Sequence, residues 1–187
     1  MNYFSGEIWE LVKKVYREPS LAITVLDHSV DAIERDNGWV CNYLFDLISS
    51  ETKYIAFMAG TDKFLHIRNR NINVVDLSSS IINVSTETLA NAIVNTLGTE
   101  ISDNIINANL NISGGIDLKM YDETTTITSE GNEVPFTGTI AGDKKQAATT
   151  FINDEYILKQ DDVIVLKFVN NGTGDVRIEY NSNGYQE

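Results

Sequence analysis

The sequence is short of several features that common classes of protein require. Its 187 residues include a single cysteine, Cys41, which excludes a disulfide framework and a zinc site built from cysteines. Lys and Arg number 14 against 27 Asp and Glu, and the net charge of −13 argues against binding to nucleic acid or to an anionic membrane. The longest apolar run, residues 21–26, is far below the about 20 residues that a membrane-spanning helix needs.

Motifs that carry catalysis or bind cofactors are also missing. The first residues lack a basic segment followed by an apolar one, so we expect no secretory signal. No glycine-rich phosphate loop and no EF-hand pattern occurs. Asp27, His28 and Ser29 are consecutive, whereas the members of a catalytic triad converge from distant positions. We therefore predict that the chain is not an enzyme and that it uses no metal and no cofactor.

Turn residues divide most of the chain into short segments of alternating hydrophobicity, and there are only two prolines. This pattern predicts an all-β fold, an antiparallel β-sandwich of jelly-roll type, over residues 20–187. The last two strands carry the clearest signal, because apolar residues alternate on both sides of the turn Asn170–Gly174 and predict an antiparallel hairpin. The predicted strands are Leu21–Asp27, Trp39–Leu47, Lys53–Ala59, Phe64–Arg68, Ile72–Leu77, Ser80–Val84, Val163–Val169 and Val176–Tyr180. Three further segments are predicted to be strands or extended loops: Ile101–Ile112, Ile116–Tyr121 and Thr124–Thr128.

Two segments carry helical spacing instead. In Ser85–Leu97 the apolar residues Leu89, Ile93 and Leu97 are four apart, which predicts one helix inserted between strands. Residues 1–19 predict an amphipathic arm that Ser5 caps and Pro19 ends. The apolar face of this arm is wide enough to anchor the chain to a partner or to a second copy, and packing on its own sandwich is the alternative. That face consists of Ile8, Trp9, Leu11, Val12, Val15 and Tyr16.

The segment Phe64–Arg68 holds the densest basic spot of an acidic chain. Strand alternation predicts Leu65 and Ile67 inside, with His66 and Arg68 on the opposite face and Arg70 just beyond. Such a group suits a carboxylate or an acidic neighbouring subunit, because arginine presents a planar fork of donors. The alternative is a half-exposed strand whose charges offset the acidic body.

The charge is unevenly distributed along the chain. Residues 1–70 carry 8 basic and 10 acidic side chains, whereas residues 71–187 carry 6 basic and 17 acidic ones. A near-neutral end and an acidic body suit a protein that is anchored at one end and solvated at the other. The alternative interpretation is that the acidity only keeps the protein soluble.

Several segments together resemble the small β-sandwich structural proteins of tailed bacteriophages, which decorate a head or form a head fibre. The segments in question are Tyr54–Phe57, Gly60–Ile67, Tyr121–Glu123 with Ile127 and Gly131-Asn132, Glu155–Lys159 and Gly184–Glu187. The resemblance implies a non-enzymatic virion protein, made in the host cytoplasm, with capsid or other virion proteins and further copies of itself as partners.

The Asn- and Thr-rich middle of the chain also suits an extracellular binding module. The alternative function is therefore a carbohydrate- or receptor-binding module of a phage tail or fibre. In that case exposed aromatic side chains would form a sugar-stacking platform, with Trp39, Tyr121, Tyr156 and Tyr185 as the candidates.

Overall fold

A computed structural model gives the architecture of most of the chain. The described residues are 37–60, 64–78, 81–108, 116–142, 148–152, 156–159 and 162–186. The predicted arm of residues 1–19, its six apolar residues and the predicted strand Leu21–Asp27 lie outside them.

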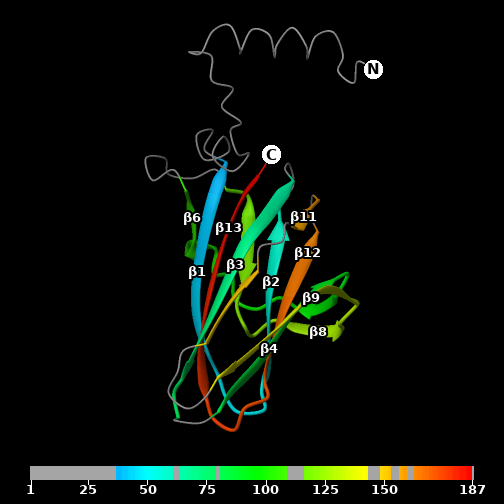
Figure 1. Cartoon of the computed structure of the whole chain (residues 1–187). Helices are drawn as coiled ribbons and strands as arrows, with labels where there is room; N and C mark the ends of the chain where they lie inside the picture. Colours follow the sequence, from blue (N-terminus) through cyan, green and yellow to red (C-terminus); the bar gives the residue numbers. More distant parts are fainter. Residues whose placement is uncertain are drawn as a thin grey trace, which may run out of the picture.

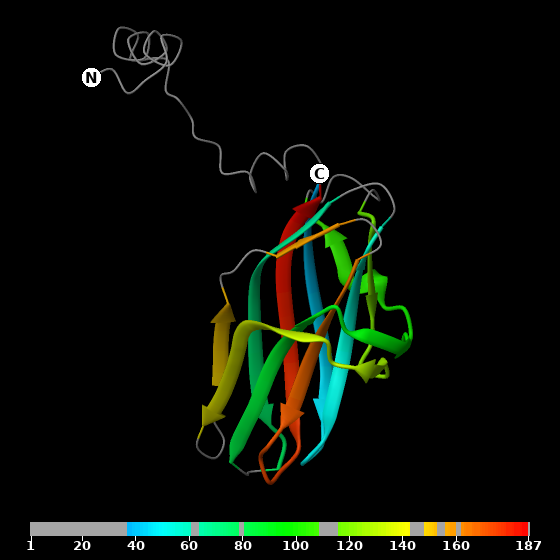
Figure 2. The ribbon, with the colours of Figure 1, turned by 90° about the vertical axis from the view of Figure 1, so that its right-hand side faces the viewer.

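The described chain is all-β, and two antiparallel sheets pack face to face (Figures 1 and 2). The β1 sheet has the order β10-β3-β13-β1-β6, and β11 also pairs with β3. Its strands are β1 (Gly38–Leu47), β3 (Leu65–Asp76), β6 (Ile105–Asn107), β10 (Ala148–Ile152), β11 (Tyr156–Leu158) and β13 (Val176–Gln186). The β2 sheet has the order β7-β2-β12-β4-β9. Its strands are β2 (Thr52–Ala59), β4 (Ile82–Ala90), β7 (Leu118–Tyr121), β9 (Asn132–Gly142) and β12 (Val163–Asn170).

The main core lies between these two sheets and follows the alternation of the sequence. Phe168 of β12 is fully buried, and its ring meets that of Phe45 of β1 edge-on at 5.2 Å between centroids. Tyr180 of β13 contacts Phe168 from the same sheet as Phe45, at 6.4 Å. Burying one such ring contributes about 1.5–3 kcal/mol, so these aromatic contacts are a main source of adhesion between the sheets.

The outer face of the β2 sheet is covered as well. A small sheet of β5 (Ile93–Thr96) and β8 (Thr126–Ser129) belongs to the segments that follow β4 and β7. A second apolar cluster is centred on buried residues of the β2 sheet, with side chains of β5 and β8 packed against it. Its buried members are Ala56, Leu89, Tyr121 and Val165. Burial on both faces explains why Val163–Leu166 is continuously apolar, as strands covered on both sides are.

The predicted hairpin of the last two strands is wrong, although both strands exist. β12 pairs with β2 and β4, whereas β13 pairs with β1 and β3. Residues 171–175 therefore form a corner that carries the chain from one sheet to the other. Both strands turn their alternating apolar side chains toward the same core, which a hairpin and a corner achieve equally well.

The predicted helix over Ser85–Leu97 is also wrong. β4 continues through Ala90, and the burial of Ile82, Val84, Thr86 and Thr88 has the period of two that a strand requires. The strand stops at Asn91, whose φ of 59° breaks the extended backbone, and β5 follows as a separate strand. The alternation of β4 is not visible in the sequence, because two of its inward positions are threonines, which do not count as apolar residues.

One further correction concerns a strand boundary. The segments Phe64–Arg68 and Ile72–Leu77 form one continuous strand, β3, which the predicted break at residues 69–71 does not interrupt. Ile101–Ile112, predicted as a strand or an extended loop, holds the 3₁₀ turn η1 (Ser102–Asn104) and the three-residue β6 within its described part. The predictions for Trp39–Leu47, Lys53–Ala59 and Ile116–Tyr121 are confirmed to within two residues.

Both described ends of the chain lie at one end of the sandwich. β1 begins where β13 finishes, because Gly38 pairs with Tyr185 (Figure 1). The opposite end carries the turn after β1 and the corner between β12 and β13. The chain before Asn37 therefore leaves from the end opposite to that corner.

Candidate functional site

The predicted basic face does not form. His66 is only 5% exposed, and its ring stacks on that of Tyr185 with centroids 4.2 Å apart. Arg70 is 2% exposed and points into the sandwich, whereas Arg68 is half-buried. The expectation that the three side chains share one open face is therefore wrong. A contact of Arg68 with another subunit stays a prediction.

A β-bulge explains the inward turn of Arg70. Opposite β3, the register of β13 shifts between Ser182, which pairs with Arg70, and Gly184, which pairs with Ile67. The extra residue on β3 reverses the alternation, so that Leu65 and Ile67 face the core before the bulge and Arg70 faces it afterwards. A count along the sequence alone has no means of finding this reversal.

Arg70 makes few polar contacts in the core. Its Nη1 donates to Thr88 Oγ1 at 2.7 Å, and its guanidinium carbon lies 4.5 Å from the centre of the Tyr156 ring. Nε and Nη2 have no hydrogen-bond partner within the described part of the chain. A cavity of about 10 Å³ beside Arg70 has room for about one water molecule. This arrangement holds a buried charge and offers no space for a larger ligand.

The four aromatic side chains proposed as a sugar platform are not open to solvent. Trp39 is fully buried, and Tyr121 and Tyr185 are each 8% exposed. Tyr156 is half-buried and is occupied by the Arg70 guanidinium. The aromatic platform predicted from the sequence is therefore wrong for these residues.

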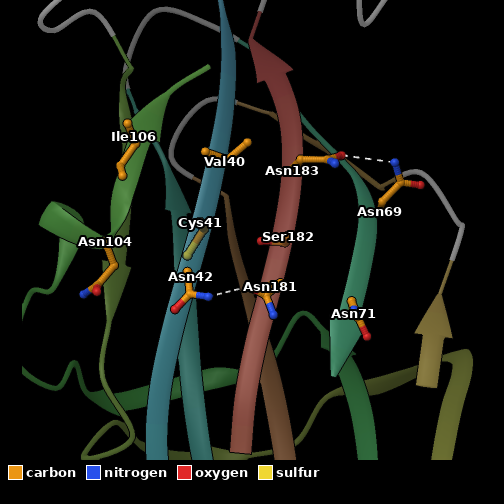
Figure 3. Close-up of a pocket in the computed structure, with 10 residues that line it drawn as sticks. All are labelled: Val40, Cys41, Asn42, Asn69, Asn71, Asn104, Ile106, Asn181, Ser182 and Asn183. Atoms are coloured by element: carbon orange, nitrogen blue, oxygen red, sulfur yellow. Dashed lines mark hydrogen bonds between the residues drawn. The ribbon is translucent and has the colours of Figure 1, made fainter. Parts of the chain in front are cut away.

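The outer face of the β1 sheet carries a hollow that the sequence did not reveal (Figure 3). We call it the asparagine pocket, and its volume is about 380 Å³. β1, β3, β6, β13 and the 3₁₀ turn η1 supply its lining, which includes six asparagines and no charged residue. The lining residues are Val40, Cys41, Asn42, Asn69, Asn71, Asn104, Ile106, Asn181, Ser182 and Asn183.

Strand pairing brings these asparagines together. Asn42 pairs with Asn181, which pairs in turn with Asn71, so one row of amides crosses three strands. Val40 pairs with Asn183 on one side and with Ile106 on the other. Alternation puts all of them on the outer face, since the residues between them belong to the core. The available signal was asparagine at alternate positions over residues 69–73 of β3 and at 181 and 183 of β13.

Hydrogen bonds fix part of this amide row. Asn42 Nδ2 donates to Asn181 Oδ1 at 2.5 Å, and Asn69 Nδ2 donates to Asn183 Oδ1 at 3.2 Å (Figure 3). The Oδ1 atom of Asn71 is shielded from solvent and has no hydrogen-bond partner in the part of the chain that the structure describes. Each amide offers two donors and an acceptor, so the pocket can exchange several hydrogen bonds with a ligand.

Glu179 lies next to the pocket on β13 and is bound by the same amide system. Asn73 and Asn42 donate to its two oxygens at 3.0 and 3.2 Å. Hydrogen bonds to the carboxylate lower the pKa of Glu179, and the bond from Asn73 makes the largest contribution. This carboxylate is therefore charged at neutral pH, and its oxygens are already engaged by side chains of the sheet.

A second hollow, of about 480 Å³, lies between the start of β2 and the loop that leads into β8. Its acidic residues already have partners in the protein. The Tyr43 hydroxyl donates to Glu123, and burial, followed by this hydrogen bond, raises the pKa of Tyr43. Nearby, Lys167 bridges Glu87 at 3.0 Å and Glu130 at 2.8 Å. These contacts hold the loop in place, and they leave no pair of unengaged carboxylates among the side chains named here.

Comparisons with known proteins add no family. No protein-family model matches the sequence, and no curated protein is significantly similar to it. Within the described ranges, no three His, Cys, Asp or Glu side chains gather closely enough to hold a metal ion. None of the helices in that part of the structure has the length and apolar character needed to cross a membrane.

Proposed function

We propose that the chain is a non-enzymatic structural protein of a tailed-phage virion. In this role it decorates or stabilises the capsid, or forms part of a head fibre, and an apolar N-terminal arm anchors it. The proposal rests on the sequence resemblance and on the strand order of the sandwich. Its partners are capsid or other virion proteins and further copies of the chain.

The strand order carries the proposal, because it matches a jelly roll. Four strands of one sheet run β1-β13-β3-β10, and four of the other run β2-β12-β4-β9. Successive strands β1 to β4 alternate between the sheets, as do β9, β10, β12 and β13. We interpret this order as the two Greek keys of a double-sheet jelly roll, an architecture of viral capsid proteins and of lectins. This argument is an analogy at the level of the fold.

The position of the chain ends supports the anchor. Residues 1–36 precede β1 and so leave from the end of the sandwich where β13 finishes. An anchor in residues 1–19 would hold that end against a shell and leave the opposite corner projecting. The acidic residues 71–187 would then form the solvated body, and many weak contacts would add up over symmetric copies.

The test compares full-length variants by light scattering. The double substitution Ile8→Asp with Val12→Asp puts two negative charges into the predicted apolar face. Lys13→Asp changes the net charge equally but falls on the predicted polar face, so it is the matched control. We expect the wild type and the control to be oligomers and the double variant to be a monomer. Equal masses for all three would refute the anchor.

The carbohydrate- or receptor-binding alternative is retained for one reason. Its aromatic platform is lost, but the asparagine pocket is a neutral polar hollow of ligand size.

A further inference from the structure

We propose that the asparagine pocket binds a neutral oligosaccharide. This inference goes beyond the structural role proposed above and does not depend on it, because it uses only the outer face of the β1 sheet. The ligand class follows from three properties of the pocket: its lack of charge, its unsatisfied amide chemistry and its apolar edge.

The lack of charge excludes several other ligands. All ten lining residues are uncharged, in a chain of which 22% is charged. A phosphate or nucleic acid needs cationic side chains, and none lines the pocket. A divalent cation needs carboxylates, and the nearby Glu179 already accepts from Asn42 and Asn73. A neutral ligand that both donates and accepts hydrogen bonds remains.

The amide groups of the pocket are suited to a ligand that both donates and accepts hydrogen bonds. Asn71 Oδ1 is shielded from solvent and has no hydrogen-bond partner among the residues that the structure describes. A buried acceptor without a donor is unfavourable, and a sugar hydroxyl that reaches this atom would supply the missing donor. The bonds Asn42–Asn181 and Asn69–Asn183 hold the neighbouring amides in place, which lowers the entropy that binding would remove.

The edge of the pocket suits the carbon-bound face of a sugar ring. Val40 and Ile106 are paired across β1 and β6, and they are 40% and 52% exposed. Sugars are amphipathic, with hydroxyls at the rim and C–H groups on the ring faces. A ring on Val40 and Ile106 would direct hydroxyls at the row of amides, and a volume of about 380 Å³ admits a short oligosaccharide.

A second copy of the chain is the competing occupant, since amides are self-complementary. The pocket favours the sugar because it is a hollow, whereas packing two such faces would leave this space unfilled. A void without partner atoms forfeits dispersion contacts, which weakens such an interface. The experiment therefore includes a measurement of mass.

The full chain is screened on an array of neutral, sialylated and sulfated oligosaccharides, and hits are titrated by ligand-observed NMR. Asn71→Ala and Asn181→Ala remove pocket amides, and Asn95→Ala removes an exposed asparagine of β5 as the control. We expect a neutral glycan to bind, each pocket variant to weaken it about tenfold, and the control to bind as the wild type does. Melting curves verify that each variant is folded.

Three outcomes would overturn the proposal. They are the absence of neutral-glycan binding at millimolar sugar, a selective preference for anionic glycans, and equal binding by wild type and both pocket variants. Light scattering of Asn181→Arg tests the competing occupant. If the wild type is a dimer and this substitution alone makes it a monomer, the face binds a second copy and the proposal is wrong. The N-terminal variants test the virion role separately, so either proposal can fail without the other.

Discussion

Asn170 joins the segments at the end of the sandwich opposite to the start of β1, and its replacement is expected to destabilise the fold strongly. The side chain is fully buried at the end of β12. Its Nδ2 donates to the carbonyls of Leu47 at 3.2 Å, Ile48 at 3.1 Å and Gly174 at 2.8 Å. Its Oδ1 accepts from the Gly172 amide at 2.9 Å. One amide thus joins the corner between the sheets to the turn after β1.

Asn170→Ala removes one accepted bond and the bonds of both Nδ2 hydrogens, one of which is shared between two carbonyls, and it leaves backbone groups without partners. At about 0.5–1.5 kcal/mol for each of these three bonds, the expected loss is about 3 kcal/mol. This is a large part of the about 5–15 kcal/mol that stabilises an ordinary domain. With a urea dependence of about 2 kcal/mol per molar, the unfolding midpoint falls by about 1.5 M.

Equilibrium urea unfolding, followed by circular dichroism and by the fluorescence of buried Trp39, measures this loss. The neighbouring Asn171→Ala is the matched control, because among the described residues that exposed side chain bonds only Ser85 Oγ, and we expect a loss below about 0.5 kcal/mol. If Asn170→Ala also stays within about 1 kcal/mol of the wild type, the corner is not held by this amide.

Asn170→Asp refines the same test through pH. The substituted carboxylate would face three carbonyl oxygens, so its pKa would lie above the unfolded value in the folded chain. For a raised pKa, the favourable contribution is present below the unfolded pKa and is lost as the pH rises. We therefore expect this variant to be nearest the wild type in acid and weakest at neutral pH; no change with pH would contradict the argument.

Three further predictions concern the core. A Cβ on Gly184 would lie 1.8 Å from the carbonyl oxygen of His66, so Gly184→Ala should destabilise by more than about 3 kcal/mol in a thermal melt; a shift of only a few degrees would contradict it. Arg70 Nε and Nη2 lack partners among the residues that the structure describes, so Arg70→Met should raise stability by about 1–3 kcal/mol, and a lower midpoint would show that the guanidinium contacts dominate. Burial raises the pKa of Cys41 from 9.0 to about 12, so a thiol reagent at pH 8 should react only after denaturant is added. Because this pKa is raised, the stability it contributes is complete below pH 9.0 and declines toward pH 12; rapid labelling of the native protein would refute the burial.

The candidate site was the part of the molecule least accessible from the sequence. The six asparagines of the pocket come from positions 42 to 183, and only the pairing of β1, β3 and β13 makes them neighbours. The basic cluster failed for the opposite reason. His66 and Arg70 are close in sequence, but a bulge that depends on β13 sends Arg70 inward.

The sequence by itself determined several of the strands and, within them, which side chains face the core. In β1 the alternation of Trp39, Cys41 and Phe45 already marked the buried face, and in β12 and β13 the same signal was clear. These features are local, because successive side chains of a strand point to opposite faces whatever the strand pairs with.

Only the tertiary structure decided which strand pairs with which. Residues 171–175 are a corner and not a hairpin because β12 finds its partners in β2 and β4 and β13 finds its own in β1 and β3. The outer cover of the β2 sheet and the asparagine pocket follow from that pairing. Their cause is physical: burial of apolar area is not directional, so alternation along a strand fixes its buried face but not its neighbour.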